Sequence, residues 1–136
     1  MSEEKEIKFS KDHEWLVLKG GIATMGISDF AQKQLGDIVS VELPKVGSAF
    51  KQREPLAIVD SVKASSDIYS IITGEVLEVN QKLLEHPELI NESPHDLGWI
   101  VRIKPSNLEE LKLLMSKDEY DSFVGESENR SQKRPE

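Results

Sequence analysis

The stretch from Leu56 to Tyr69 constrains the fold more than any other part of the chain, because two β-prone segments flank a short polar one. Residues 56–59 and 68–72 are rich in the β-branched residues that favour strands, whereas residues 61–66 are mostly small and polar. Strand, turn and strand in this order predict a β-hairpin. A mainly β fold organised around this hairpin is therefore expected.

A single lysine, Lys63, falls near the tip of the predicted hairpin. Its neighbours Ser61, Ala64 and Ser65 are too small to shield the ε-amine, so a large enzyme could reach it. A solvated lysine without a special role is the commoner interpretation of such a residue. The pattern that flanks Lys63 favours a modified lysine instead.

The chain of 136 residues is long enough for one domain with its own core. No apolar run approaches the ~18 residues of a membrane span, and the acidic start lacks the features of a signal or transit peptide. We therefore expect a cytoplasmic protein. Composition divides the chain into a flexible N-terminus at 1–6, a domain at 7–124 and a disordered tail at 125–136.

The charge and the residue types exclude several classes of function. The formal net charge of −8, from 25 acidic and 17 basic residues, disfavours nucleic acid and anionic membranes as partners. The absence of cysteine excludes disulfides and thiolate catalysis, and His13, His86 and His95 are too scattered to predict a metal site. No catalytic triad spacing or phosphate loop is visible, so no catalytic residue is predicted.

Short strands and short helices account for the rest of the chain. In residues 37–43, alternation predicts a strand with Val39, Val41 and Leu43 on one face, and residues 36–42 resemble 74–80, which suggests two similar halves of a sandwich. Further strands are expected at 7–9, 16–18, 22–25, 75–80 and 98–104. Helices are expected at 28–35, 108–115 and 117–123. The last two helices are predicted from capping-box spacings at Asn107/Glu110 and Ser116/Glu119.

The sequence Asp-Ser-Val-Lys-Ala at 60–64 resembles the Glu-Ser-Val-Lys-Ala lipoylation motif of the H proteins of the glycine cleavage system. Asp60 departs from the usual glutamate by one carbon. The resemblance extends from about residue 7 to residue 124. Further segments match the family in order and spacing, namely 13–15, 26–32, 35–39, 41–44, 65–70, 74–76, 78–80, 87–91 and 98–99.

The resemblance implies a lipoyl/biotinyl-type hybrid fold, with two antiparallel sheets in a sandwich and a few short helices, some of them C-terminal. It implies lipoic acid in amide linkage to Lys63, and a non-catalytic, monomeric carrier. Its partners would be glycine decarboxylase, which loads an aminomethyl group on the arm, the aminomethyltransferase that unloads it, dihydrolipoyl dehydrogenase, and a lipoate ligase or octanoyltransferase.

Family members shelter the loaded arm in a surface cleft, and Glu14 and Asp67 match positions implicated there. A carboxylate can hold a protonated amine by a charge-assisted hydrogen bond. A solvated turn carboxylate is the competing interpretation for each residue. The chain also departs from common family residues, with Asp12 for serine, Gln34 for histidine, Arg53 for a turn glycine and Ile71 for proline.

Two alternatives to a glycine cleavage carrier remain at this point. One is an H-like lipoyl donor or relay that hands its lipoyl group to other enzymes and never carries a glycine-derived carbon. The other is an acyltransferase-type lipoyl or biotinyl domain cut from a larger enzyme. The second is weaker, because it does not explain the match at 13–15 or the C-terminal helices.

Overall fold

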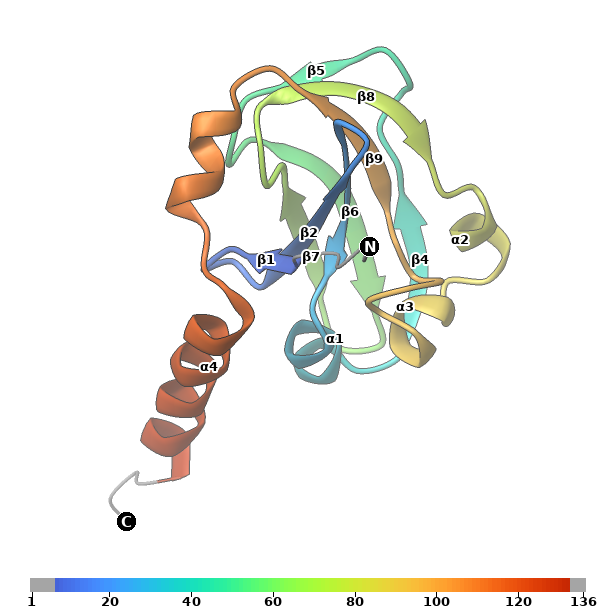
Figure 1. Cartoon of the computed structure of the whole chain (residues 1–136). Coiled ribbons are helices and arrows are strands. Elements are labelled where there is room, and N and C mark those ends of the chain that lie inside the picture. Colours follow the sequence, from blue (N-terminus) through green and yellow to red (C-terminus); the bar gives the residue numbers. More distant parts are fainter. Residues whose placement is uncertain (1–6, 133–136) are drawn as a thin grey trace.

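Two antiparallel sheets form the body of the protein, and a long helix follows them (Figure 1). The computed structural model describes the backbone of residues 7–132 and the side chains of residues 7–125. The larger sheet has the order β1-β2-β3-β9-β8-β5, and the smaller sheet has the order β4-β6-β7. Their strands are β1 Ile7–Phe9, β2 Glu14–Lys19, β3 Ile22–Ile27, β4 Ile38–Glu42, β5 Ala49–Phe50, β6 Pro55–Ser61, β7 Ser65–Tyr69, β8 Gly74–Val79 and β9 Val101–Pro105.

The main hydrophobic core joins the two sheets. Leu16 and Met25 of the larger sheet and Val59 and Ile68 of the smaller sheet belong to one buried cluster. Burial of these apolar side chains is the main stabilising contribution to such a fold. The two similar segments of the sequence become β4 and β8, one in each sheet. The prediction of a mainly β sandwich is therefore confirmed.

Short helices close the ends of the sandwich. The helix α1, Asp29–Leu35, begins after Ser28, whose hydroxyl accepts the Ala31 N–H, and ends at Gly36 with a φ of 82°. Only glycine adopts that conformation readily, so both predicted ends of this helix are confirmed. The other helices are α2 Lys82–Glu85, α3 Leu89–Glu92, the 3₁₀ helix η1 Leu108–Leu113 and α4 Lys117–Gln132. No helix in the described part of the chain is both long enough and apolar enough to cross a membrane.

The prediction for Val39 was wrong. The register of β4 against β6 shifts between Ile38 and Ser40, so a bulge interrupts the alternation. As a result Ile38 and Val41 point into the core, whereas Val39 is 54% exposed. The strand after the tip also ends earlier than expected, at Tyr69, and Ile71 and Ile72 are buried beyond it.

The C-terminal segment differs from the expected pair of short helices. Residues 108–113 form a 3₁₀ helix, and Glu110 accepts hydrogen bonds from the N–H and hydroxyl of Thr73 instead of completing a capping box. The second capping box is real, because Ser116 and Glu119 exchange both of its hydrogen bonds.

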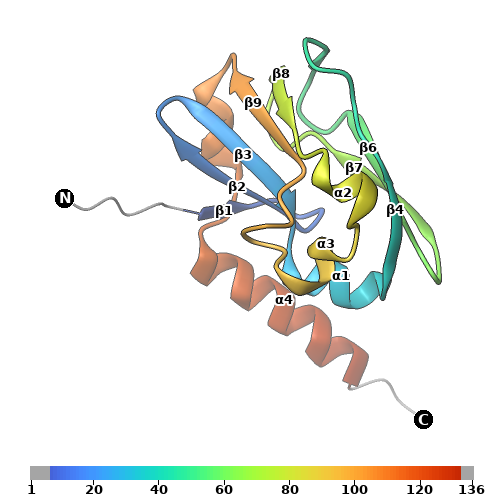
Figure 2. The same ribbon diagram turned by 90° about the vertical axis from the view of Figure 1, so that its right-hand side faces the viewer.

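The helix that this box begins, α4, continues to Gln132, into the tail expected to be disordered (Figure 2). The polar residues of that tail include Glu126, Glu128 and Arg130, which favour helix well enough to extend one that is already nucleated. Residues 1–6 and 133–136, at the two predicted flexible ends, lie outside the described residues.

Candidate functional site

The predicted hairpin is present, with Lys63 in the turn between β6 and β7. Asp60 and Ser65 are the last paired residues. The turn is held by Ser61, whose hydroxyl accepts the N–H groups of Lys63 (3.1 Å) and Ala64 (3.0 Å) while its own N–H donates to the Ala64 carbonyl (2.7 Å). Such local bonds are the reason serine favours turns. Lys63 is therefore exposed on a backbone with a defined shape.

Asp60 connects the strands just below the tip. Its carboxylate accepts a hydrogen bond from the Ser40 hydroxyl on β4 at 2.9 Å. Hydrogen bonds from Ser65 and Ser40 hold the pKa of the Asp60 carboxyl below its usual range. The shorter side chain, one methylene less than the glutamate of the resembled motif, thus still reaches partners on both neighbouring strands.

The tip is also tied to the end of α1. The N–H of Val62 donates to the Asp37 carbonyl at 3.0 Å. A Cβ added at Gly36 would lie 3.3 Å from Cε of Lys63 and 3.8 Å from Cγ2 of Val62. The lysine stem consequently rests against the C-terminal end of α1, which is the same end of the molecule as the hairpin tip (Figures 1 and 2).

Asn91 of α3 holds this end of α1 in place. Its amide N–H groups donate to the Gly36 carbonyl and to Oε1 of Gln32, both at 2.9 Å, and its Oδ1 accepts the N–H of Ile38 at 2.9 Å. A half-buried amide with three such partners fixes the junction of α1 and β4. Asp37, whose carbonyl accepts the N–H of Val62, lies in this junction. The sequence marked Asn91 only as part of the resemblance, because nothing local indicates partners 53 to 59 residues away.

A groove of about 180 Å³ lies beside the hairpin, and we call it the hairpin groove. One wall is β7, including the exposed Asp67, and the opposite wall is α1, including Gln34 and Leu35. Because the stem of Lys63 rests on the end of α1, a group attached to this side chain would start beside the groove. The residues that line the groove are Asp12, His13, Ile27, Ala31, Gln34, Leu35, Ser66, Asp67 and Ile68.

Glu14 does not line the hairpin groove. It is 2% exposed, and its two carboxylate oxygens accept hydrogen bonds from the Tyr69 N–H and the Ser10 hydroxyl, both at 2.9 Å. Burial raises the pKa of Glu14 to about 8, although these two bonds oppose the shift. Glu14 borders a neighbouring cavity that also includes Asp12 and Arg53, so the structure does not bring Glu14 and Asp67 into one cavity.

Arg53, which stands where the resembled family usually has a turn glycine, has a φ of 77°. This left-handed conformation is costly for a residue with a Cβ and explains the preference for glycine there. The N–H of Arg53 donates to the Ser70 carbonyl at 2.7 Å, and its guanidinium lies 3.5 Å from Asp12. Arg53 therefore keeps the turn and adds an ion pair beside the cavity of Glu14.

The three histidines do not gather into a metal site. His13 forms a hydrogen bond with Tyr120 and packs against the rings of Phe30 and Phe123. His86 pairs with Glu88 on the surface. In the part of the chain that the structure describes, no three potential ligands from His, Asp and Glu come together.

The comparisons with known proteins agree on one family. The model of the glycine cleavage H-protein family matches residues 7–127. A glycine cleavage system H protein from Halothermothrix orenii is 48% identical over 128 residues, covering 94% of this chain and all of the relative, and one from Caulobacter vibrioides is 48% identical over 119 residues. The crystal structure of a glycine cleavage system H protein from Mycobacterium marinum aligns with a TM-score of 0.81 at 30% identity, covering 90% of this chain and 99% of that one.

Proposed function

Because the chain belongs to the glycine cleavage H-protein family, we propose that Lys63 is the residue through which it works, by carrying a lipoyl group on its ε-amine. The protein is the lipoyl carrier of glycine cleavage. The observation that supports Lys63 is its place, exposed in a two-stranded turn whose backbone is fixed on both sides. The small neighbours leave room for a modifying enzyme.

The residues around Lys63 suit an attached lipoyl arm. Amide formation removes the lysine charge, and the lipoyl dithiolane then supplies the sulfur atoms that accept the glycine-derived carbon and pass electrons on. The hairpin holds the point of attachment still, and the groove between β7 and α1 offers the arm a place to dock. A tethered arm works at a high effective concentration near its partner's active site.

Within this proposal, Asp67 and Glu14 have different tasks. Asp67 is exposed and lines the groove, so its carboxylate can meet a protonated amine on a docked arm. Glu14 is buried and accepts the N–H of Tyr69, the last residue of β7, so it supports the strand that carries Asp67. Both residues serve the loaded arm and leave attachment of the lipoyl group unaffected.

The partners in this proposal are glycine decarboxylase, the aminomethyltransferase, dihydrolipoyl dehydrogenase and a lipoate ligase or octanoyltransferase. The carrier would act as a cytoplasmic monomer and contribute no catalytic group of its own. Family membership favours this role over that of a lipoyl relay without a part in glycine cleavage.

Reconstitution with a bacterial glycine decarboxylase tests the function. We expect the lipoylated chain to support release of CO₂ from glycine, with saturation as its concentration rises, and Lys63→Arg to support none. A lipoylated chain that cannot support decarboxylation, yet gives its lipoyl group to a second acceptor domain, would contradict the carrier role and establish the relay.

A further inference from the structure

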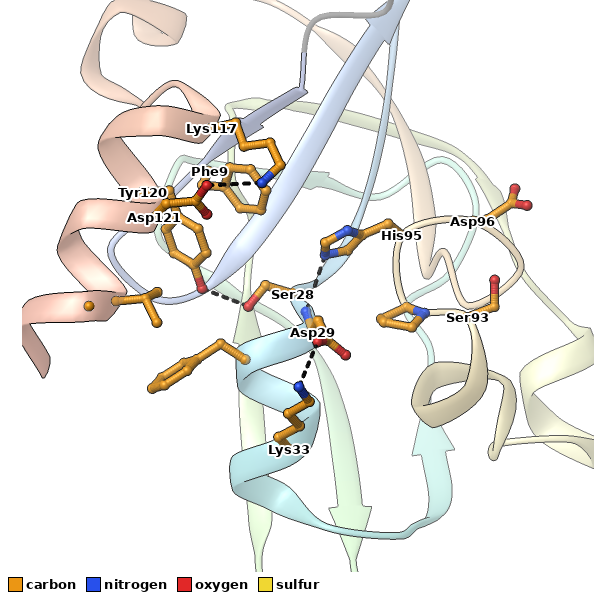
Figure 3. Close-up of a pocket in the computed structure, with 14 residues that line it drawn as sticks. Phe9, Ser28, Asp29, Lys33, Ser93, His95, Asp96, Lys117, Tyr120 and Asp121 are labelled. Carbon is orange, nitrogen blue, oxygen red and sulfur yellow. Dashed lines mark hydrogen bonds and ion pairs between the residues drawn. The ribbon is translucent and has the colours of Figure 1, made fainter. Parts of the chain in front are cut away.

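Tyr120 of α4 reaches from the C-terminal helix to the start of α1 (Figure 3). The residue is 5% exposed, and its ring stacks on Phe9, with ring centroids 4.2 Å apart and an angle of 4° between the planes. Its hydroxyl lies 2.7 Å from Oγ of Ser28 and 2.7 Å from Nδ1 of His13. One hydroxyl thus connects α4, the cap of α1 and the loop that precedes β2.

The partners of Ser28 determine the direction of these hydrogen bonds. Oγ of Ser28 already accepts the Ala31 N–H, and the side chain is 1% exposed. Among the described residues, the Tyr120 oxygen is the acceptor within hydrogen-bonding distance of the Ser28 hydroxyl. Ser28 therefore donates to Tyr120, and Tyr120 donates to Nδ1 of His13, which keeps a proton on Nε2 only. The opposite direction would leave a buried hydroxyl proton without an acceptor.

One end of this chain of hydrogen bonds lies in the hairpin groove, and the other end caps the helix that forms a wall of the groove. His13 lines the groove and has a φ of 68°, an unfavourable conformation that its surroundings must hold. Ser28 caps α1, whose residues Ala31 and Leu35 line the opposite side. Phe30 packs against the His13 ring at 4.7 Å between centroids. The backbones of the two parts are joined where the Ser28 N–H donates to the His13 carbonyl at 2.9 Å, and the hydroxyl of Tyr120 adds a side-chain link that fixes the His13 ring.

We propose that Tyr120 is a positioning residue for the hairpin groove, through which the C-terminal helix sets the geometry that a docked lipoyl arm meets. The inference rests on the proposed function for the arm, but the hydrogen bonds of the Tyr120 hydroxyl are a property of the unmodified chain. The variant Tyr120→Phe removes the hydroxyl and retains the ring that stacks on Phe9. Tyr69→Phe, which removes the only other tyrosine hydroxyl of the sequence, is the matched control.

The first readout is the tautomer of His13, measured by ¹⁵N NMR on the folded, unmodified protein. We expect wild type and Tyr69→Phe to show a proton on Nε2 alone at pH 7.5. Tyr120→Phe should show a mixture of tautomers, with shifted amide signals in α1 and β7, because no hydroxyl donates to Nδ1. A general loss of stability would not change the tautomer of the molecules that remain folded. An unchanged tautomer in Tyr120→Phe would overturn the proposal.

The second readout is the rate at which the loaded arm loses its glycine-derived carbon without enzyme. We expect Tyr120→Phe to release it about threefold to tenfold faster, the equivalent of one hydrogen bond, and Tyr69→Phe to match wild type. A changed tautomer with an unchanged release rate would overturn the role toward the arm. If wild type accepts no lipoyl group at all, the proposed function fails instead, and the NMR measurement alone decides whether Tyr120 holds the groove.

Discussion

Glu14 is a buried carboxyl group whose protonation should be visible in the stability of the whole protein. Its pKa is raised to about 8, whereas an unfolded chain has the ordinary value near 4.3. Between these values the folded state binds more protons than the unfolded state, so the contribution of Glu14 to stability falls as pH rises. The shift corresponds to at most about 5 kcal/mol, fully lost above pH 8.

The variant Glu14→Gln should flatten this dependence. Glutamine keeps an oxygen that accepts the Tyr69 N–H but has no proton to lose. We expect the free energy of unfolding, measured by urea denaturation from pH 5 to pH 8, to decrease less steeply with pH in the variant than in wild type. Parallel curves would show that Glu14 does not titrate in this range.

Asp67 provides a second test at the scale of single residues. Because it lines the groove and is exposed, Asp67→Asn should remove a charge-assisted bond to a protonated amine on the docked arm. Solvent screening limits the effect to roughly 1 kcal/mol, so we expect spontaneous release of the glycine-derived carbon to accelerate by up to about fivefold. Attachment of the lipoyl group should proceed at the wild-type rate. Indistinguishable half-lives would remove Asp67 from the docking site.

The position of Lys63 in the turn of the β6–β7 hairpin can be tested by changing the length of the turn. Asp60 already binds partners on neighbouring strands, so Asp60→Glu should change the rate of lipoyl attachment little. One glycine inserted between Val62 and Lys63 should nearly abolish attachment, because it breaks the turn that Ser61 holds and redirects the amine. Equal attachment rates for the insertion variant would mean that the ligase does not recognise the position of the lysine in the turn.

The helix α3 supports the tip through Asn91, and Asn91→Ala should expose this role. Loss of three hydrogen bonds should lower the free energy of unfolding by roughly 2 to 4 kcal/mol. It should also raise the KM for lipoyl attachment, since the junction that bonds Val62 loosens.

Asn80→Ala is the matched control for Asn91→Ala, because it removes two amide hydrogen bonds, to the carbonyls of Leu97 and Trp99. We expect it to lower stability without a change in this KM. An equal rise in KM for the two variants would show a general effect of destabilisation instead of a local support of the tip.

Local signals predicted the elements well, and long-range contacts explain the differences. The hairpin, the Ser28 and Gly36 ends of α1 and the capping box at Ser116 depend on neighbouring residues, and the structure confirms them. The exposure of Val39 follows from a bulge, and no alternating pattern reveals a bulge. Nothing in the sequence near Asn91 or Tyr120 indicates that their partners lie on α1 and before β2, so both were missed as supports of the site.

At the scale of the whole molecule, the two sheets and the helices place one lysine where an enzyme can reach it and a groove beside it. The smaller sheet carries the turn, α1 and α3 fix the tip, and α4 contacts His13 in the groove and the Ser28 cap of α1. Elements distant in sequence thus converge on the surroundings of Lys63, while the core lies between the sheets. We propose that this arrangement presents a lipoyl group on Lys63.

Intact-mass spectrometry after incubation with lipoate, ATP and a lipoate ligase tests this claim most directly. The wild-type chain should gain the mass of one lipoyl group, and a peptide map should locate it on Lys63. Lys63→Arg, which keeps the positive charge but cannot form the amide, should gain none, whereas Lys33→Arg, a lysine on α1, should be modified like wild type. A lipoyl group on the Lys63→Arg chain, or none on a folded wild-type chain that meets an active ligase, would contradict the account.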